Sequence, residues 1–269
     1  MQLTEAIAPL EDGYAELLAA VAELLREDEQ VRALWVSGSV ARGTADAGSD
    51  LDVVVTVRDP APFTDPSAWS SLDPVITEPI PGRAASFALT VRSGLRIDVV
   101  VEGVEELAAT PYRHRVEVFD RDGLVVPDPP ADGGGPDPAA MGAVVTEFLR
   151  QAAIFPAAVV AREDWLLGQV AVHNYSVLLF RLFAESNRPL PPMGVKQWSA
   201  RLTEPQREVL AALPQPRATR EDVVAAMIAV RDALITHGRV AVESVGGTWP
   251  DGIEAAVAAY WRRHELPWG

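Results

Sequence analysis

The sequence contains no cysteine, which excludes disulfide bonds, thiolate metal ligands and thiol nucleophiles. We find no run of the roughly 20 apolar residues that a membrane span needs. The N-terminal segment carries acids where a secretory signal would carry bases. Any chemistry must therefore rest on carboxylates, hydroxyls and the four histidines, and we expect a soluble cytoplasmic protein without a membrane partner.

Basic residues are also scarce, and the formal net charge is −15. Residues 1–126 hold 22 acids and 10 bases, whereas residues 139–269 hold 13 of each. Binding a phosphate backbone requires clustered Lys and Arg. The composition therefore argues against a nucleic-acid partner and favours a small-molecule substrate.

Proline and glycine are concentrated in one stretch near the middle of the chain, PDPPADGGGPDP at residues 127–138. Such a stretch stops both helix and strand and offers nothing apolar for burial. A chain of 269 residues is long enough for two cores. We therefore predict a first domain over 1–126, a linker over 127–138 and a second domain over 139–269.

Helix and strand signals alternate in the first domain. An acidic amphipathic helix is expected over about residues 3–29, and a hairpin around Asp122-Gly123 is expected to close the domain. The strand candidates between them are residues 31–38, 50–57, 86–91 and 95–103. This pattern predicts an α/β (α+β) domain with a small mixed sheet.

The second domain has few strand signals. Its apolar residues recur at helical spacing in four long segments, residues 141–187, 196–213, 220–245 and 253–264. We therefore predict an all-α helical bundle.

The first motif that carries chemistry is SGSVARG, which follows the strand candidate over 31–38. Gly38 and Ser39 allow the backbone to turn sharply and to expose N–H groups, an arrangement that suits a phosphate. Arg42 lies one helical turn later, where its guanidinium can reach the same anion.

The second motif is a group of strand acids. Asp50 and Asp52 are two residues apart, so both point to the same side of a strand. Asp98 lies between Ile97 and Val99 in another buried strand candidate. If the two strands adjoin, three carboxylates converge, and like charges in one place need a cation. Magnesium is the natural choice, because it prefers oxygen ligands and substrate phosphates.

Together these residues resemble the nucleotidyltransferase superfamily of the DNA polymerase β type. Its hallmark is Gly-Ser, about a dozen residues, then Asp-hydrophobic-Asp and a later strand acid. Within it, the GSxARG motif, the acidic chain and the helical second domain look like the antibiotic O-nucleotidyltransferases. Those enzymes adenylylate a hydroxyl of aminoglycosides or lincosamides with ATP and magnesium.

The resemblance implies a role for each motif residue. Asp50 and Asp52 would hold one or two magnesium ions, and Asp98 would ligate metal and take the proton of the attacking hydroxyl. Four residues would bind the triphosphate of ATP, namely Gly38, Ser39, Arg42 and Ser49. The implied activity is AMP transfer to an aminoglycoside such as streptomycin or spectinomycin, which is an adenylyltransferase of EC 2.7.7 type and would confer antibiotic resistance.

Lys196 is the only lysine of the chain, beside 22 arginines, and it follows a proline-rich turn. Streptomycin-modifying enzymes look similar here, with a lysine that meets the triphosphate. The resemblance therefore implies that Lys196 binds ATP, although a lone surviving lysine is equally compatible with a neutral surface position.

Residues of the second domain are candidates for binding the acceptor. Gln169 and His173 are four residues apart on an apolar helix and form part of a polar stripe. Glu163, Asp164 and Trp165 begin that helix, and acids beside an aromatic ring suit a cationic sugar. Acids are equally common at helix N-termini for structural reasons, and a buried histidine is often only part of a core.

Several alternatives stay open. The chain resembles lincosamide nucleotidyltransferases as well as aminoglycoside enzymes, and an antitoxin-type protein adenylyltransferase or a non-catalytic nucleotide-binding sensor shares the same motifs. The segment from Arg231 to His237 faintly resembles the Arg-spacer-His signature of helical ribonuclease domains. We expect a monomer.

Overall fold

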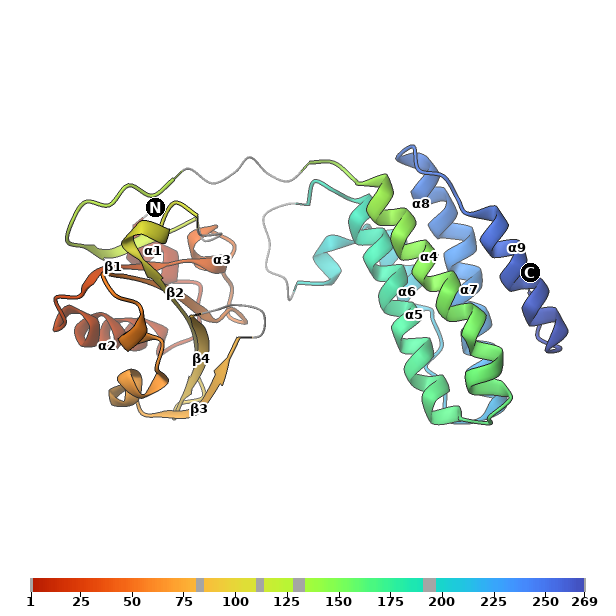
Figure 1. The fold of residues 1–269 in the computed structure, drawn as a ribbon, viewed down its shortest axis with the longest axis horizontal. Coiled ribbons are helices and arrows are strands. Elements are labelled where there is room, and N and C mark those ends of the chain that lie inside the picture. Colours follow the sequence, from red (N-terminus) through yellow and green to blue (C-terminus); the bar gives the residue numbers. More distant parts are fainter. Residues whose placement is uncertain (1, 81–84, 110–113, 128–133, 191–196, 269) are drawn as a thin grey trace. The chain divides into compact units, whose positions relative to one another are not determined.

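The structure is a computed structural model of the 269-residue chain, and it describes residues 2–80, 85–109, 114–127, 134–190 and 197–268. The chain divides into two compact units (Figure 1). The first, unit 1, is formed by Met1–Ala131, and the second, unit 2, by Asp132–Pro191 together with Gln197–Gly269.

Unit 1 is built on a six-stranded mixed sheet of order β3-β4-β5-β2-β1-β6. The central neighbours β2 and β5 run parallel, whereas the other neighbouring pairs are antiparallel. The strands are β1 (Val31–Val36), β2 (Leu51–Val57), β3 (Pro74–Pro79), β4 (Ser86–Val91), β5 (Arg96–Gly103) and β6 (Val116–Asp120). The prediction of an α/β first domain with a small mixed sheet is confirmed.

The main core of unit 1 lies on one face of this sheet. Alternate residues of β2, such as Val53 and Val55, point into it and are fully buried. Two helices, α1 (Leu3–Ile7) and α2 (Tyr14–Arg26), supply apolar side chains to the same core. The single helix that we expected is thus divided, because Gly13 between them has a left-handed φ of +97°.

One expectation for unit 1 was wrong, and one strand was missed. The closing hairpin does not form, because the Asp120 carboxylate accepts N–H groups from Asp122, Gly123 and Leu124, and β6 pairs with β1 instead. Strand β3 was not predicted, since it carries proline at both ends and its residues are mostly exposed.

The opposite face of the sheet carries a buried polar network. The Trp35 indole N–H donates to the Thr56 hydroxyl (3.0 Å), which donates to Glu102 (2.8 Å). Arg115 forms a bidentate ion pair with the same carboxylate, at 2.6 and 2.9 Å. Thr56 and Glu102 are register partners on β2 and β5, so this network links the two strands that also carry Asp52 and Asp98.

Unit 2 is helical, and within residues 134–190 and 197–268 it contains no strand. Its core is formed mainly by packing among α4, α5, α7 and α9. The helices are α4 (Pro138–Phe155), α5 (Trp165–Ser186), α6 (Glu204–Ala211), α7 (Arg220–Ala233), α8 (Arg239–Ser244) and α9 (Asp251–Arg263). The prediction of a helical second half is confirmed.

Two helical segments of unit 2, Pro138–Val160 and Trp165–Ser186, are long and apolar enough to cross a membrane, which our sequence analysis did not expect. Both supply fully buried side chains to the core, including Phe148 and Leu179. A helix at the centre of a folded core requires the same composition. These helices are therefore weak support for a membrane location, and the predicted cytoplasmic location stays a prediction.

The buried network allows a test of the fold. We expect Glu102→Ala to lower the free energy of unfolding by about 3–5 kcal/mol, because Arg115 is left as a buried charge without its carboxylate. Urea denaturation followed by circular dichroism measures this loss. Arg92→Ala removes an exposed arginine from the Arg92–Asp73 pair and should stay close to wild type. A Glu102 variant as stable as the Arg92 variant would contradict the assigned role.

Candidate active site

The acids of the motif lie at one end of the parallel strand pair. In the register of β2 and β5, Asp52 is directly opposite Asp98. Register partners on neighbouring strands point to the same face, so the two half-buried carboxylates share one side of the sheet. Asp50 lies one residue before β2, and its carboxylate is 3.9 Å from the guanidinium of Arg96, which also contacts Asp98. The structure therefore places all three acids in one region.

Gly38 lies against this region and has no room for a side chain. Its φ is +62°, and a Cβ built on it would lie 1.8 Å from Oδ2 of Asp52. The backbone N–H of Ser37 donates to the Asp52 carbonyl at 2.9 Å. The turn that follows β1 is thus fixed to β2 at the acidic residue itself, and only glycine permits the approach.

Ser37 was not singled out from the sequence, although it is the first residue of SGSVARG. It is 1% exposed, and its Oγ has no hydrogen-bond partner within the described residues. An unpartnered buried hydroxyl is costly and rare. Its position beside Gly38 is therefore suited to a hydrogen bond with a polar group of a bound ligand.

The turn itself is a short helix, α3 (Gly38–Ala41). Ser39 is buried, and its carbonyl accepts the Thr44 N–H at 2.9 Å. Arg42 is exposed at the end of the helix, and its guanidinium makes no ion pair within the described residues. Ser49 is engaged with Asp46 in closing the next loop, since its hydroxyl donates to that carboxylate at 3.0 Å.

Arg96 was not predicted as a site residue, yet it contacts two of the acids, Asp98 and Asp50. Its Nε donates to Asp98 Oδ1 at 2.8 Å, and its Nη1 lies 3.3 Å from Glu78 on β3. The hydrogen bond that Arg96 donates to Asp98 raises the pKa of Arg96 above its usual value. Arg96 is two residues before Asp98 on β5, and side chains two residues apart on a strand point to the same face. This spacing is the sequence signal that could have identified Arg96.

The three carboxylates are chemically suitable ligands for a magnesium ion, because Mg²⁺ takes oxygen ligands from carboxylates and phosphates. The close approach of Gly38 and the unpartnered Ser37 hydroxyl are consistent with a polar ligand there. Within the described residues, however, no group of three His, Cys, Asp or Glu side chains is arranged to hold a metal ion. The metal roles of Asp50, Asp52 and Asp98 therefore stay a proposal.

We compared the sequence with models of known protein families. The family model described as a nucleotidyltransferase domain matches residues 18–110, a range that includes Gly38, Asp52 and Asp98. The chain carries a nucleotidyltransferase domain. No curated protein matches the sequence significantly.

Solved structures show only distant similarity to the chain. An aminoglycoside 6-adenyltransferase from Bacillus subtilis has 14% identity and a TM-score of 0.41, over 91% of this chain and 97% of that one. A nucleotidyltransferase-like protein from Exiguobacterium sibiricum has 13% identity and a TM-score of 0.36, over 94% and 92%. A Thermotoga maritima CCA-adding enzyme complexed with tRNA has 14% and 0.35, over 98% and 68%. Because these TM-scores are below 0.5, the similarities support no conclusion about substrate.

Outside the matched domain, the proposed acceptor residues lie at the start of α5 and along it. Asp164 is the N-cap of α5 and accepts the Leu167 N–H at 3.0 Å, while Glu163 beside it is exposed. Trp165 is half-buried against the core of unit 2, and Gln169 donates to the Pro216 carbonyl at 2.7 Å. Asp164, Trp165 and Gln169 thus each have a contact within unit 2, and their role in acceptor binding stays a prediction. Lys196 lies outside the described residues.

His173 differs from the rest, because it is exposed and lines a cavity of unit 2 with a volume of about 460 Å³. The cavity is lined by α5, by α6 and by the segments on either side of α6. Phe180 and Trp198 stack within it, with ring centroids 4.0 Å apart. None of the described residues that line it is acidic. A volume in the range of about 300–1,000 Å³ is usual for small-molecule sites.

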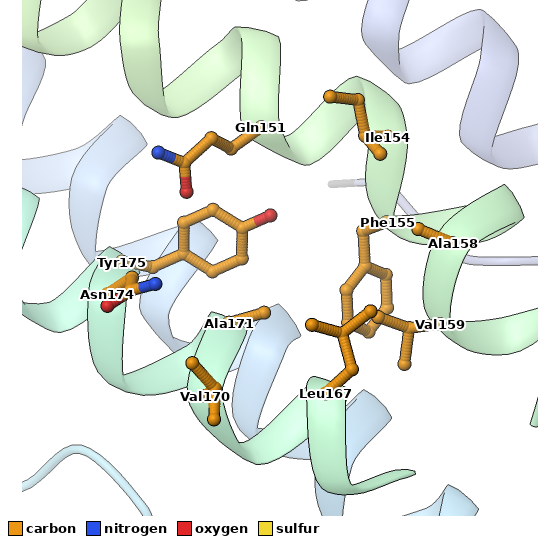
Figure 2. Close-up of a pocket in the computed structure, with 10 residues that line it drawn as sticks. All are labelled: Gln151, Ile154, Phe155, Ala158, Val159, Leu167, Val170, Ala171, Asn174 and Tyr175. Atoms are coloured by element: carbon orange, nitrogen blue, oxygen red, sulfur yellow. The ribbon is translucent and has the colours of Figure 1, made fainter. Parts of the chain in front are cut away.

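A second cavity of unit 2 is smaller, at about 170 Å³, and lies between α4 and α5 (Figure 2). Phe155, Val159 and Leu167 give it an apolar wall, and Tyr175 reaches it from α5. Burial raises the pKa of Tyr175 above its usual value, so this hydroxyl is unsuited to act as a base. The cavity with His173 is the better candidate for a ligand.

The close approach of Gly38 to Asp52 can be tested against a matched glycine. Gly43 also has a left-handed φ, +70°, but an added Cβ there would have no atom within 4 Å. We expect Gly43→Ala to cost about 1–2 kcal/mol of stability for backbone strain. Gly38→Ala should cost at least about 1 kcal/mol more, because the Asp52 carboxylate must move.

The free energies of unfolding of the two variants come from urea titrations on the same protein preparation. Equal losses for the two variants would mean that Gly38 is needed only for its backbone angle and not for its contact with Asp52.

Proposed function

We propose that this chain is an adenylyltransferase that transfers AMP from ATP to a hydroxyl of a small-molecule acceptor. The observation that carries the proposal is the pairing of Asp52 with Asp98 on adjacent parallel strands, beside a Gly38 turn that contacts Asp52. The matched nucleotidyltransferase domain covers all of these residues.

The three acids would hold magnesium. Asp50, Asp52 and Asp98 share one region of the sheet, and their mutual repulsion favours a bound cation. Bound magnesium would supply charge neutralisation of the phosphate oxygens. The protein's own contribution is to hold the carboxylates on two hydrogen-bonded strands, where their separation is fixed by the sheet.

The turn after β1 would bind the triphosphate. Arg42 is exposed and makes no ion pair within the described residues, so its guanidinium is available to an anion. The buried Ser37 hydroxyl, which has no hydrogen-bond partner within the described residues, would be a further donor. Gly38, Ser39 and Ser49 would complete the turn as the motif implies, and Lys196 would add a cation from the segment outside the described residues.

Asp98 would act as the base. It would accept the proton of the acceptor hydroxyl while the hydroxyl oxygen bonds to the α-phosphorus and the bond to the departing pyrophosphate breaks. A carboxylate next to magnesium is a competent base for this step. The acceptor leaves with AMP attached, and pyrophosphate carries away the electron pair of the broken bond.

The first candidate for the acceptor is an aminoglycoside such as streptomycin or spectinomycin, which the GSxARG motif favours. The supporting residues in unit 2 would be Glu163, exposed beside the N-cap of α5, and His173 in the larger cavity. Asp164, Trp165 and Gln169 would act by holding α5 in place, since each already has a structural contact.

The larger cavity favours a second candidate, a lincosamide. Its described lining contains the stacked Phe180 and Trp198 rings and no acid, whereas a polycationic aminoglycoside would need carboxylates. An acceptor with an apolar ring and few charges suits such a surface.

One alternative loses support from the structure. The ribonuclease-like signature needs a reactive Arg231, but this side chain is 2% exposed and donates to Asp232 and to the Pro267 carbonyl. It also lies over the rings of Trp261 and Trp268. Arg231 is therefore part of the packing of unit 2.

The decisive experiment incubates the purified chain with ATP, magnesium and a panel of aminoglycosides and lincosamides, and detects a gain of AMP by mass spectrometry. We expect one acceptor class to be modified, and Asp98→Asn to lower the rate at least about 100-fold through loss of the base. Modification of a protein in place of every small molecule would support the antitoxin-type alternative.

Asp12→Asn is the matched control, because Asp12 is an exposed acid of unit 1 outside the site. It should leave the rate unchanged, and circular dichroism should show both variants folded. Product formation at the wild-type rate by Asp98→Asn would contradict the proposed chemistry. ATP binding without transfer to any acceptor would favour the sensor.

A further inference from the structure

We propose that Arg96 is a built-in counter-ion of the site, which competes with the divalent cation for Asp98 and Asp50 and turns to Glu78 when the cation binds. The inference rests on the proposed function, because it takes these acids as the cation site.

The contacts of Arg96 in the protein alone carry the first step. Its Nε donates to Asp98 Oδ1 at 2.8 Å and lies 3.9 Å from Asp50 Oδ2. The side chains of Asp98 and Asp50 are 21% and 19% exposed, so they are largely shielded from water. Shielded carboxylates favour a positive partner, and Arg96 provides one by its hydrogen bond to Asp98 and its proximity to Asp50.

A metal ion and Arg96 cannot use the same oxygen of Asp98 in the same way. Arg96 occupies Oδ1 of Asp98, and a cation coordinated by the same carboxylate would lie close enough to the guanidinium for the two positive charges to repel each other. In the proposed competition, this repulsion shifts the Arg96 side chain away from Asp98.

The sheet provides a second partner for Arg96. Asp52, Asp98, Ala88 and Glu78 are successive register partners on β2, β5, β4 and β3, so they form one row across four strands. Ala88, whose side chain is a single methyl group, is the register neighbour of both Asp98 and Glu78. Glu78 Oε1 is already 3.3 Å from Arg96 Nη1 and is 56% exposed.

Arg96 therefore has acceptors on two sides: Asp98 and Asp50 on one side, and Glu78 on the other. The cation would compete for the first two acceptors only. When the acids near β2 take the ion, the contact with Glu78 keeps the guanidinium paired. Arg96 would thereby lower the affinity for the free ion and hold Asp98 in place until the ion arrives. Arg96 acts through Asp98 and is a positioning residue.

The test titrates the full-length chain with Mn²⁺ in the absence of nucleotide and measures free Mn²⁺ by electron paramagnetic resonance. We expect Arg96→Met to lower the Kd for Mn²⁺ at least about fivefold. Arg96→Lys, which keeps the charge but not the fork of donors, should lie between Arg96→Met and wild type. Circular dichroism checks that each variant is folded.

Two further variants separate this role from a general effect of charge. Arg92→Met removes the same charge from the same hairpin, where Arg92 pairs with Asp73 away from the site acids, and should leave the Kd unchanged. Glu78→Gln should weaken Mn²⁺ binding in the wild-type background and have less effect when combined with Arg96→Met.

An Arg96→Met variant that binds Mn²⁺ no more tightly than wild type would overturn the inference. Loss of ATP binding in that variant without tighter Mn²⁺ binding would make Arg96 a triphosphate ligand instead, which also overturns it. If these results accompany AMP transfer by the wild-type chain, only the role of Arg96 fails. If neither protein binds Mn²⁺, the acids are not a cation site and the proposed function fails as well.

Discussion

The parallel hydrogen-bonded register of β2 and β5 is the constraint on which the site depends. It places Asp52 opposite Asp98 at a distance set by the sheet, where two carboxylates repel each other. Arg96 offsets part of this repulsion by its ion pair with Asp98. The turn after β1 approaches Asp52 so closely that only glycine fits at position 38. The buried Thr56–Glu102 link, four residues further along the same two strands, holds that register.

The second unit supplies a different kind of surface. Its helices are apolar because they form a core, and the composition that would suit a membrane is used to bury residues such as Phe148 and Leu179. What remains for a ligand is a cavity beside α5, where His173 and two stacked aromatic rings meet. Unit 1 thus carries a cluster of acidic side chains, and unit 2 carries an apolar cavity.

The residues of the site followed from the sequence because they obey local rules. The spacing of Asp50 and Asp52 and the isolated acid Asp98 among β-branched residues are visible in a strand with period two. The contact of Arg96 with Asp98 was not foreseen, although both lie on one face of β5, and the contacts of Arg96 with Asp50 and Glu78 depend on which strands are neighbours. The N-cap role of Asp164 was one of two interpretations left open, and the hydrogen bond accepted from Leu167 supports it. Strand β3 gave no signal, because an exposed edge strand lacks apolar alternation.

A crystal structure of the chain with Mn²⁺ and a non-hydrolysable ATP analogue tests the central claim most directly. The account predicts an anomalous peak at Mn²⁺ bonded to carboxylate oxygens of both Asp52 and Asp98, with the triphosphate against the Gly38 turn. A structure in which the nucleotide and the ion bind elsewhere, and Arg96 still occupies Asp98, would contradict it.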